Sequence, residues 1–125
     1  MNASINKREQ HLETIEQARK AVDVASEKQA TDILLLDLRK VSTFADFFVI
    51  MTAESRRQMD ALSQDMEGEL KRLGARLHHR EGTPDSGWLL LAFGDVIVHL
   101  FAPEEREFYQ LEERWSKGQQ VVRVQ

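Results

Sequence analysis

Hydrophobic side chains recur every three or four positions between residues 10 and 28, with charged residues between them. This spacing places them on one face of an amphipathic helix. The pattern then changes, because residues 32–38 and 45–52 are almost continuously apolar. Short runs of this kind are typical of strands that are buried on both faces. The first part of the chain therefore predicts a helix and then two strands, with a turn over residues 39–43 between the strands.

A second helix is predicted over residues 56–73. Ser55 and Gln58 have the spacing of a capping box, in which each side chain satisfies a backbone N–H of the first helical turn. Gly74 can adopt the left-handed conformation that ends a helix. The apolar stripe of this helix recurs at intervals of three and four and consists of Met59, Leu62, Met66, Leu70 and Leu73.

Two apolar runs, residues 88–93 and 96–101, are separated only by Gly94 and Asp95, which is a strong signal for a β-hairpin. A two-residue turn pairs the flanking residues, and opposite residues share a face of the sheet. One predicted face carries Trp88, Leu90, Ala92, Ile97, His99 and Phe101. The other carries Leu89, Leu91, Phe93, Val96, Val98 and Leu100. Both faces are therefore apolar.

The remaining segments are shorter. Residues 76–81 are polar and predict an edge strand, and turn-forming residues predict a loop over 82–87. Pro103 opens a third helix, since proline is favoured in the first helical turn. This helix is predicted to end before Gly118. The apolar residues predicted to line its inner side are Phe108, Leu111 and Trp115.

These elements predict an α+β (mixed α/β) fold, with a five-stranded mixed sheet packed with about three helices. Residues 1–9 are expected to be a flexible N-terminus, residues 10–117 a single domain, and residues 118–125 a C-terminal tail that could add a short strand. Several strands are apolar on both sides while few helices are available to cover them. Part of one sheet face can therefore remain open, and an exposed apolar patch usually marks a binding surface.

Composition excludes several classes of protein. The 125 residues include 17 Lys and Arg against 21 Asp and Glu, a net charge of -4, which disfavours direct binding to nucleic-acid phosphates. No apolar run approaches the ~20 residues that span a bilayer, and the first residues lack the apolar core of a signal peptide. The chain has no cysteine, so nothing indicates an oxidising compartment, and we expect a cytoplasmic protein.

A series of residues over positions 12–116 has an order and spacing that together are highly specific. In chain order they are Lys28, Ala30, Asp32, Ile33, Asp37, Leu38, Ala45, Asp46, Phe47, Phe48, Val49, Ile50, Ser55, Glu81, Gly82, Trp88, Gly94, Asp95, Val96, Val98, His99, Arg106, Tyr109, Leu111, Glu112 and Trp115. This series resembles the ribosomal silencing factor family, RsfS or Iojap.

The resemblance implies a factor that is not an enzyme and needs no cofactor. Such a factor binds the large ribosomal subunit through ribosomal protein fourteen, blocks joining of the small subunit, and represses translation when nutrients are scarce. The resemblance also implies a nucleotidyltransferase-like fold without the transferase chemistry. Two positions depart from the family. Ala92 replaces an acidic residue on the face predicted to meet the partner, and Ala53 replaces a glycine at the turn into the second helix.

Trp88 follows a loop and begins a strand, and tryptophan is enriched among the anchor residues of interfaces, although it is also often a core residue. We predict a partner-binding surface around it. For His99, the favoured interpretation is a partly buried histidine with satisfied hydrogen bonds, and a place on the contact surface is the alternative. Acidic and apolar residues together suit a basic protein on an RNA-rich particle. The predicted surface consists of Trp88, Leu90, Glu81, Asp95, His99 and Tyr109.

Two other function classes stay open. Asp32, Asp37 and Asp46 lie near the first two strands and could mimic the metal cluster of a nucleotidyltransferase or a nucleotide-sensing relative. However, Asp32 and Asp37 fall on opposite faces of a regular strand, and residues 53–58 contain no glycine to cradle a triphosphate. We therefore predict no catalytic, cofactor-binding or metal-binding residues. The other class is a homodimeric interaction module that pairs through an open sheet edge or face.

Overall fold

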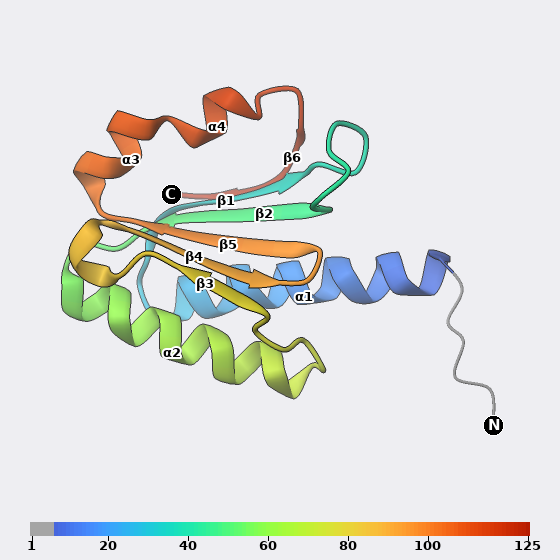
Figure 1. Ribbon diagram of the computed structural model, residues 1–125, viewed down its shortest axis with the longest axis horizontal. Helices are drawn as coiled ribbons and strands as arrows, with labels where there is room; N and C mark the ends of the chain where they lie inside the picture. The colour runs from blue at the N-terminus through green and yellow to red at the C-terminus, as the bar shows by residue number, and fades with distance from the viewer. Residues whose placement is uncertain (1–6) are drawn as a thin grey trace.

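The computed structural model describes the backbone of residues 7–125 and the side chains of residues 14–125, and it shows an α+β fold (Figure 1). Residues 1–6 of the predicted N-terminus lie outside the described residues. The helices are α1 (Lys7–Glu27), α2 (Arg56–Arg72), α3 (Pro103–Tyr109) and α4 (Leu111–Arg114), with a 3₁₀ turn, η1, over Pro84–Ser86. The strands are β1 (Thr31–Asp37), β2 (Phe47–Thr52), β3 (His79–Glu81), β4 (Trp88–Phe93), β5 (Val96–Phe101) and β6 (Gln119–Val124).

The sheet has six strands in the order β3-β4-β5-β2-β1-β6. Strands β2 and β5 run parallel, and the other neighbours are antiparallel. The predicted count of five strands is wrong, because β6 pairs with β1 along the edge of the sheet. Three of its six residues are valine, which favours a strand, and the backbone hydrogen bonds to β1 stabilise it. Gly118 permits this approach, since a Cβ there would lie 2.6 Å from the Cδ2 of Leu38.

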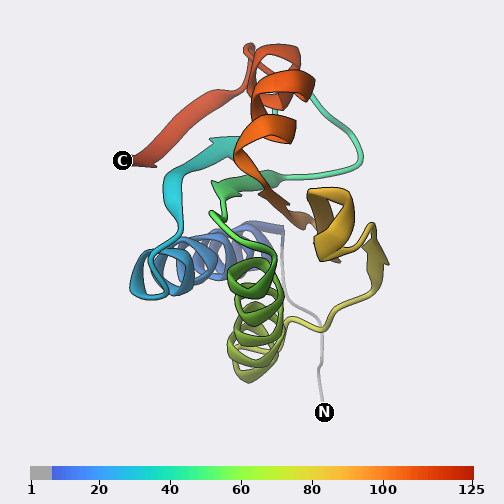
Figure 2. The same cartoon turned by 90° about the vertical axis from the view of Figure 1, so that its left-hand side faces the viewer.

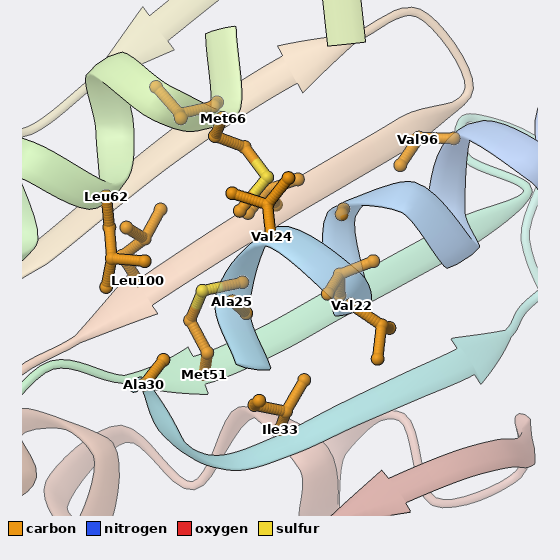
Figure 3. Packing of buried hydrophobic residues seen from close by; sticks show 14 of the residues in the cluster. Val22, Val24, Ala25, Ala30, Ile33, Met51, Leu62, Met66, Val96 and Leu100 are labelled. Carbon is orange, nitrogen blue, oxygen red and sulfur yellow. The ribbon is translucent and has the colours of Figure 1, made fainter. Parts of the chain in front are cut away.

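Helices α1 and α2 cover one face of the sheet, while α3 and α4 lie on the other (Figure 2). The face under α1 and α2 holds the larger core, in which Val24, Leu62, Met66 and Leu100 are at most 2% exposed (Figure 3). The hairpin register is as predicted, with Phe93 opposite Val96. All six residues predicted for its second face belong to this larger core.

The predicted capping box at the start of α2 is confirmed in part. The Ser55 hydroxyl accepts the backbone N–H of Gln58 at 3.0 Å. The Gln58 side chain, however, accepts the backbone N–H of Glu54 at 2.7 Å instead of that of Ser55. Its amide nitrogen donates to the carbonyls of Lys28 and Gln29, at 3.2 and 3.0 Å, so that it also ties α2 to the end of α1.

The third predicted helix is divided, because Gln110 adopts a left-handed φ of 46° between α3 and α4. Leu111 is buried and Trp115 packs partly buried beside it, as expected. Phe108 does not line the inner side, since it is 78% exposed. The buried position on α3 belongs to Arg106, which is 7% exposed. Phe108 is two positions after Arg106, a rotation of about 200° around the helix axis, so its side chain faces solvent.

Part of the second sheet face stays open, as the sequence indicated. Helices α3 and α4 pack over β1, β2 and the end of β5. On β4, alternate residues are only half-buried, and these are Trp88, Leu90 and Ala92. No helix in the described part of the chain is both long and apolar enough to cross a membrane.

Candidate protein-binding site

The open part of the sheet is hollowed where β4 begins. This hollow has a volume of about 280 Å³, and β3, η1, β4 and α3 contribute to its walls. It brings together four of the six residues predicted for the partner surface, although they lie up to 28 positions apart in the sequence. The lining residues are Glu81, Gly82, Ser86, Trp88, Leu90 and Tyr109.

The backbone before Trp88 is fixed by the turn η1. Thr83 and Ser86 form a capping box around the turn, and Gly87 ends it with a φ of 80°. The Ser86 hydroxyl is 3.0 Å from the carbonyl oxygen of Trp88. A Cβ at Gly82 would lie 2.1 Å from the same oxygen, so this position requires glycine. The loop thus delivers Trp88 to the sheet in one defined position.

The Trp88 indole is held on three sides. It stacks on Phe101, its cross-strand partner, with ring centroids 4.8 Å apart and an interplanar angle of 30°. The ring of Tyr109, on α3, lies against the indole, with ring centroids 4.7 Å apart. Its Nε1–H donates to the Nδ1 of His99 at 3.2 Å. A half-buried aromatic side chain that is immobilised in this way loses little conformational entropy on binding, which suits an anchor residue.

His99 lies beneath the predicted surface and not on it. It is 3% exposed, and burial lowers its pKa to about 3, so the side chain is neutral at physiological pH. Its ring contacts that of Phe48, with centroids 4.5 Å apart. The prediction that His99 belongs to the contact surface is corrected in this respect, because the side chain reaches Trp88 instead of the solvent. His99 lies opposite Leu90 on the face that also carries Trp88. Both faces of the hairpin are apolar in sequence, so the sequence could not show which part of each face other elements cover.

Asp95 does not belong to the hollow. It lies in the turn at the far end of the β4–β5 hairpin, where its carbonyl oxygen accepts the backbone N–H groups of Asp46 and Phe47. Strands of six residues separate it from Trp88 by about 20 Å, at ~3.3 Å per residue. The structure therefore does not bring Asp95 to the other predicted residues.

One carboxylate lines the hollow, that of Glu81, and two more lie on the neighbouring turn of α3. Glu81 is exposed, and its carboxylate lies 3.0 Å from the Nε2 of His79. Glu104 and Glu105 occupy the first turn of α3, and the side chain of Glu105 packs against Gly87. This surface combines a fixed aromatic group with carboxylates, a combination that favours a basic protein as the partner.

Sequence reasoning missed part of an ionic network that anchors α3. The guanidinium of Arg106 donates to the Glu112 carboxylate at 2.9 and 3.3 Å. Arg106 also donates to the Thr52 hydroxyl at 2.9 Å, and Arg123 of β6 donates to both carboxylate oxygens of Asp32 at 3.0 Å. Asp32 and Arg123 are 91 positions apart, so no local pattern could have joined them.

The three aspartates considered for a catalytic cluster do not all converge, because Asp37 and Asp46 both lie near Arg39 while Asp32 lies at the other end of β1. Asp32 is the second residue of β1 and pairs with Arg106 and Arg123, whereas Asp37 ends β1 and pairs with Arg39 at 2.7 Å. The Arg39 side chain lowers the pKa of Asp37 below its ordinary value, as expected for a salt-bridged carboxylate. Among the described residues, no group of three or more histidine, aspartate or glutamate side chains could hold a metal ion.

Comparison with known proteins adds sequence evidence to this geometry. The family model described as "Ribosomal silencing factor during starvation" (RsfS) matches residues 11–125. The ribosomal silencing factor RsfS of Bacillus subtilis is 35% identical over 96 residues, which cover 77% of this chain and 81% of the relative. The chloroplastic protein Iojap of Zea mays is 42% identical over 94 residues, which cover 75% of this chain but 41% of the plant protein.

Two solved structures share the fold. A crystal structure of a protein from Chromobacterium violaceum matches with a TM-score of 0.79 and 28% identity, covering 90% of this chain and 92% of that protein. A second, from Bacillus halodurans, matches with a TM-score of 0.74 and 30% identity, covering 86% and 98% of the two chains. The resemblance noted from the sequence is thus confirmed, and the chain belongs to the ribosomal silencing factor (RsfS) family.

Proposed function

We propose that this protein is a translational repressor that binds the large ribosomal subunit and keeps the small subunit from joining it. Membership in the ribosomal silencing factor family supports the class of function. The observation that carries the proposal is the hollow around Trp88, which an immobilised and half-buried indole lines together with the exposed carboxylate of Glu81. Such a surface fits a protein partner better than a small substrate.

The partner that we propose is ribosomal protein fourteen of the large subunit. The contact surface consists of Glu81, Trp88, Leu90 and Tyr109, which line one hollow. Asp95 can take part only if the partner extends along the whole β4–β5 hairpin. The net charge of -4 would repel ribosomal RNA, so docking on a basic ribosomal protein gives the chain a route to the particle.

The proposed mechanism is steric. A bound domain of 14.5 kDa occupies space that the small subunit needs, with no reaction, no turnover and no cofactor. The pairing of Asp32 and Asp37 with arginines at opposite ends of β1 supports this over a nucleotidyltransferase activity. The lack of cysteine is compatible with a reducing compartment such as the cytoplasm.

Sedimentation of purified ribosomal subunits tests the proposal. The protein is mixed with large subunits from the organism that encodes it, and small subunits are then added under conditions that favour joining. We expect the protein to migrate with the large subunit and the fraction of joined particles to fall as its concentration rises. Failure to migrate with the large subunit, or an unchanged fraction of joined particles at saturation, would exclude the proposed function.

A further inference from the structure

The hydrogen bond between Trp88 and His99 fixes the protonation of the histidine. An indole nitrogen can only donate, so the Nδ1 of His99, 3.2 Å away, must carry a lone pair. A neutral imidazole then bears its proton on Nε2. This Nε2 is buried and has no hydrogen-bond partner among the described residues. His99 therefore satisfies the donor of Trp88 while its own donor remains unsatisfied.

Core packing does not explain a histidine at this position. The ring of His99 lies among the apolar rings of Phe48 and Phe101, on a strand whose neighbouring side chains are aliphatic or aromatic. A leucine or phenylalanine would fill similar space without burying an unsatisfied donor, which costs stability. The feature that an apolar residue could not supply is the acceptor that faces the Trp88 indole.

We propose that His99 is a positioning residue, which holds the Trp88 indole in its binding orientation by accepting its only hydrogen-bond donor. This inference rests on the proposed function, because it concerns the same surface. With its N–H turned inward to His99, Trp88 meets the partner through its apolar ring alone. The group that enters the hollow is then an apolar side chain of the partner, packed against Trp88 and Leu90. Polar contacts come from the rim, where Glu81 and Tyr109 lie.

Three variants test whether the orientation of Trp88 can change while the protein stays folded. His99→Leu removes the acceptor and keeps an apolar side chain of similar size. His99→Asn places an amide oxygen at a position close to that of Nδ1 and restores an acceptor. Trp88→Phe identifies the indole N–H signal of Trp88 by its disappearance and removes the donor. Circular dichroism and denaturation verify that each variant folds.

The first readout is exchange of the Trp88 indole proton with solvent, measured by nuclear magnetic resonance on the free protein. We expect exchange to be faster by about fivefold or more in His99→Leu, the factor that corresponds to the loss of one neutral hydrogen bond, and close to wild type in His99→Asn. The signal of Trp115 serves as the internal control and should not change. Equal exchange of the Trp88 proton in wild type and His99→Leu would overturn the inference.

The second readout is affinity for isolated large ribosomal subunits. We expect His99→Leu to weaken binding by about fivefold and His99→Asn to restore it, and we expect His99→Leu to have no further effect in a Trp88→Phe background. An equal loss of affinity with and without the indole donor would overturn the positioning role. The proposed function fails if the wild type does not bind large subunits, whereas unchanged binding of Trp88→Ala shows that the partner binds elsewhere and overturns the positioning role of His99. The two failures are thereby distinguished.

Discussion

Arg106 on α3 reaches Asp32 on β1, 74 positions away in the sequence, by donating to its backbone carbonyl oxygen and lying 3.5 Å from its carboxylate. Asp32 has a φ of 45°, and the register of β1 shifts beside it. A bulge of this kind turns a backbone group out of the sheet ladder, and here the side chain of Arg106 satisfies it. The buried guanidinium of Arg106 therefore joins α3 to the sheet.

Replacing this cation should be costly. We predict that Arg106→Met lowers the free energy of unfolding by about 3 kcal/mol, because it leaves the Glu112 carboxylate and the Asp32 carbonyl without their buried partner. Urea denaturation measures the change. Arg114→Met, an exposed arginine on α4, is the matched control and should cost less than about 0.5 kcal/mol. Equal effects of the two variants would contradict the assigned role of Arg106.

Truncation of the anchor should abolish most of the binding without unfolding the protein. We predict that Trp88→Ala weakens binding to large ribosomal subunits by about 2 kcal/mol or more, the usual scale for an interface anchor. The matched control is Phe44→Ala, since Phe44 is 57% exposed and belongs to the loop between β1 and β2, away from the hollow. Unchanged affinity of a folded Trp88→Ala protein, measured by titration, would show that the partner binds elsewhere.

Two glycine substitutions should change the stability of the protein in opposite directions. Gly82 has a φ of 82°, and an added Cβ would collide with the carbonyl oxygen of Trp88, so we predict that Gly82→Ala destabilises the protein by about 2 kcal/mol. Gly68 lies within α2 with open space around it, so Gly68→Ala should stabilise by about 0.5–1 kcal/mol. Thermal and urea unfolding measure both, and a stabilised Gly82→Ala variant would refute the close approach.

The buried histidine predicts a pH dependence of stability. The folded-state pKa of His99 is about 3, below its ordinary value of 6.5, because burial disfavours the charged ring. Between these values the unfolded state binds more protons, so the folded state loses stability as the pH falls. At pH 5 the loss amounts to about 2 kcal/mol, given the ordinary pKa of the unfolded chain.

Denaturation at pH 7.5 and at pH 5 tests this linkage. His99→Asn has no titrating group at the position and shares every other carboxylate and histidine with the wild type. We therefore expect the wild type to lose about 2 kcal/mol more than His99→Asn between the two pH values. Parallel losses in the two proteins would mean that His99 is accessible to protons in the folded state.

The sequence determined the local elements because each is specified by neighbours in the chain. The Gly94-Asp95 turn set the register of the hairpin, and Gly74, with a φ of 85°, ended α2 as its position indicated. The alternation along β4 also identified the face that carries Trp88. Two of the departures from prediction depend on distant partners: β6 forms a sixth strand through hydrogen bonds to β1, and Arg106 instead of Phe108 takes the buried side of α3.

Which candidate residues share a surface was decided by the tertiary structure alone. Glu81, Trp88 and Tyr109 come from three separate elements and line one hollow, because the sheet order and the path of α3 bring those elements together. The same packing buries His99 and places Asp95 at the other end of the hairpin. Hydrophobic periodicity shows which side chains share a face, but it carries no information about which part of that face another element covers.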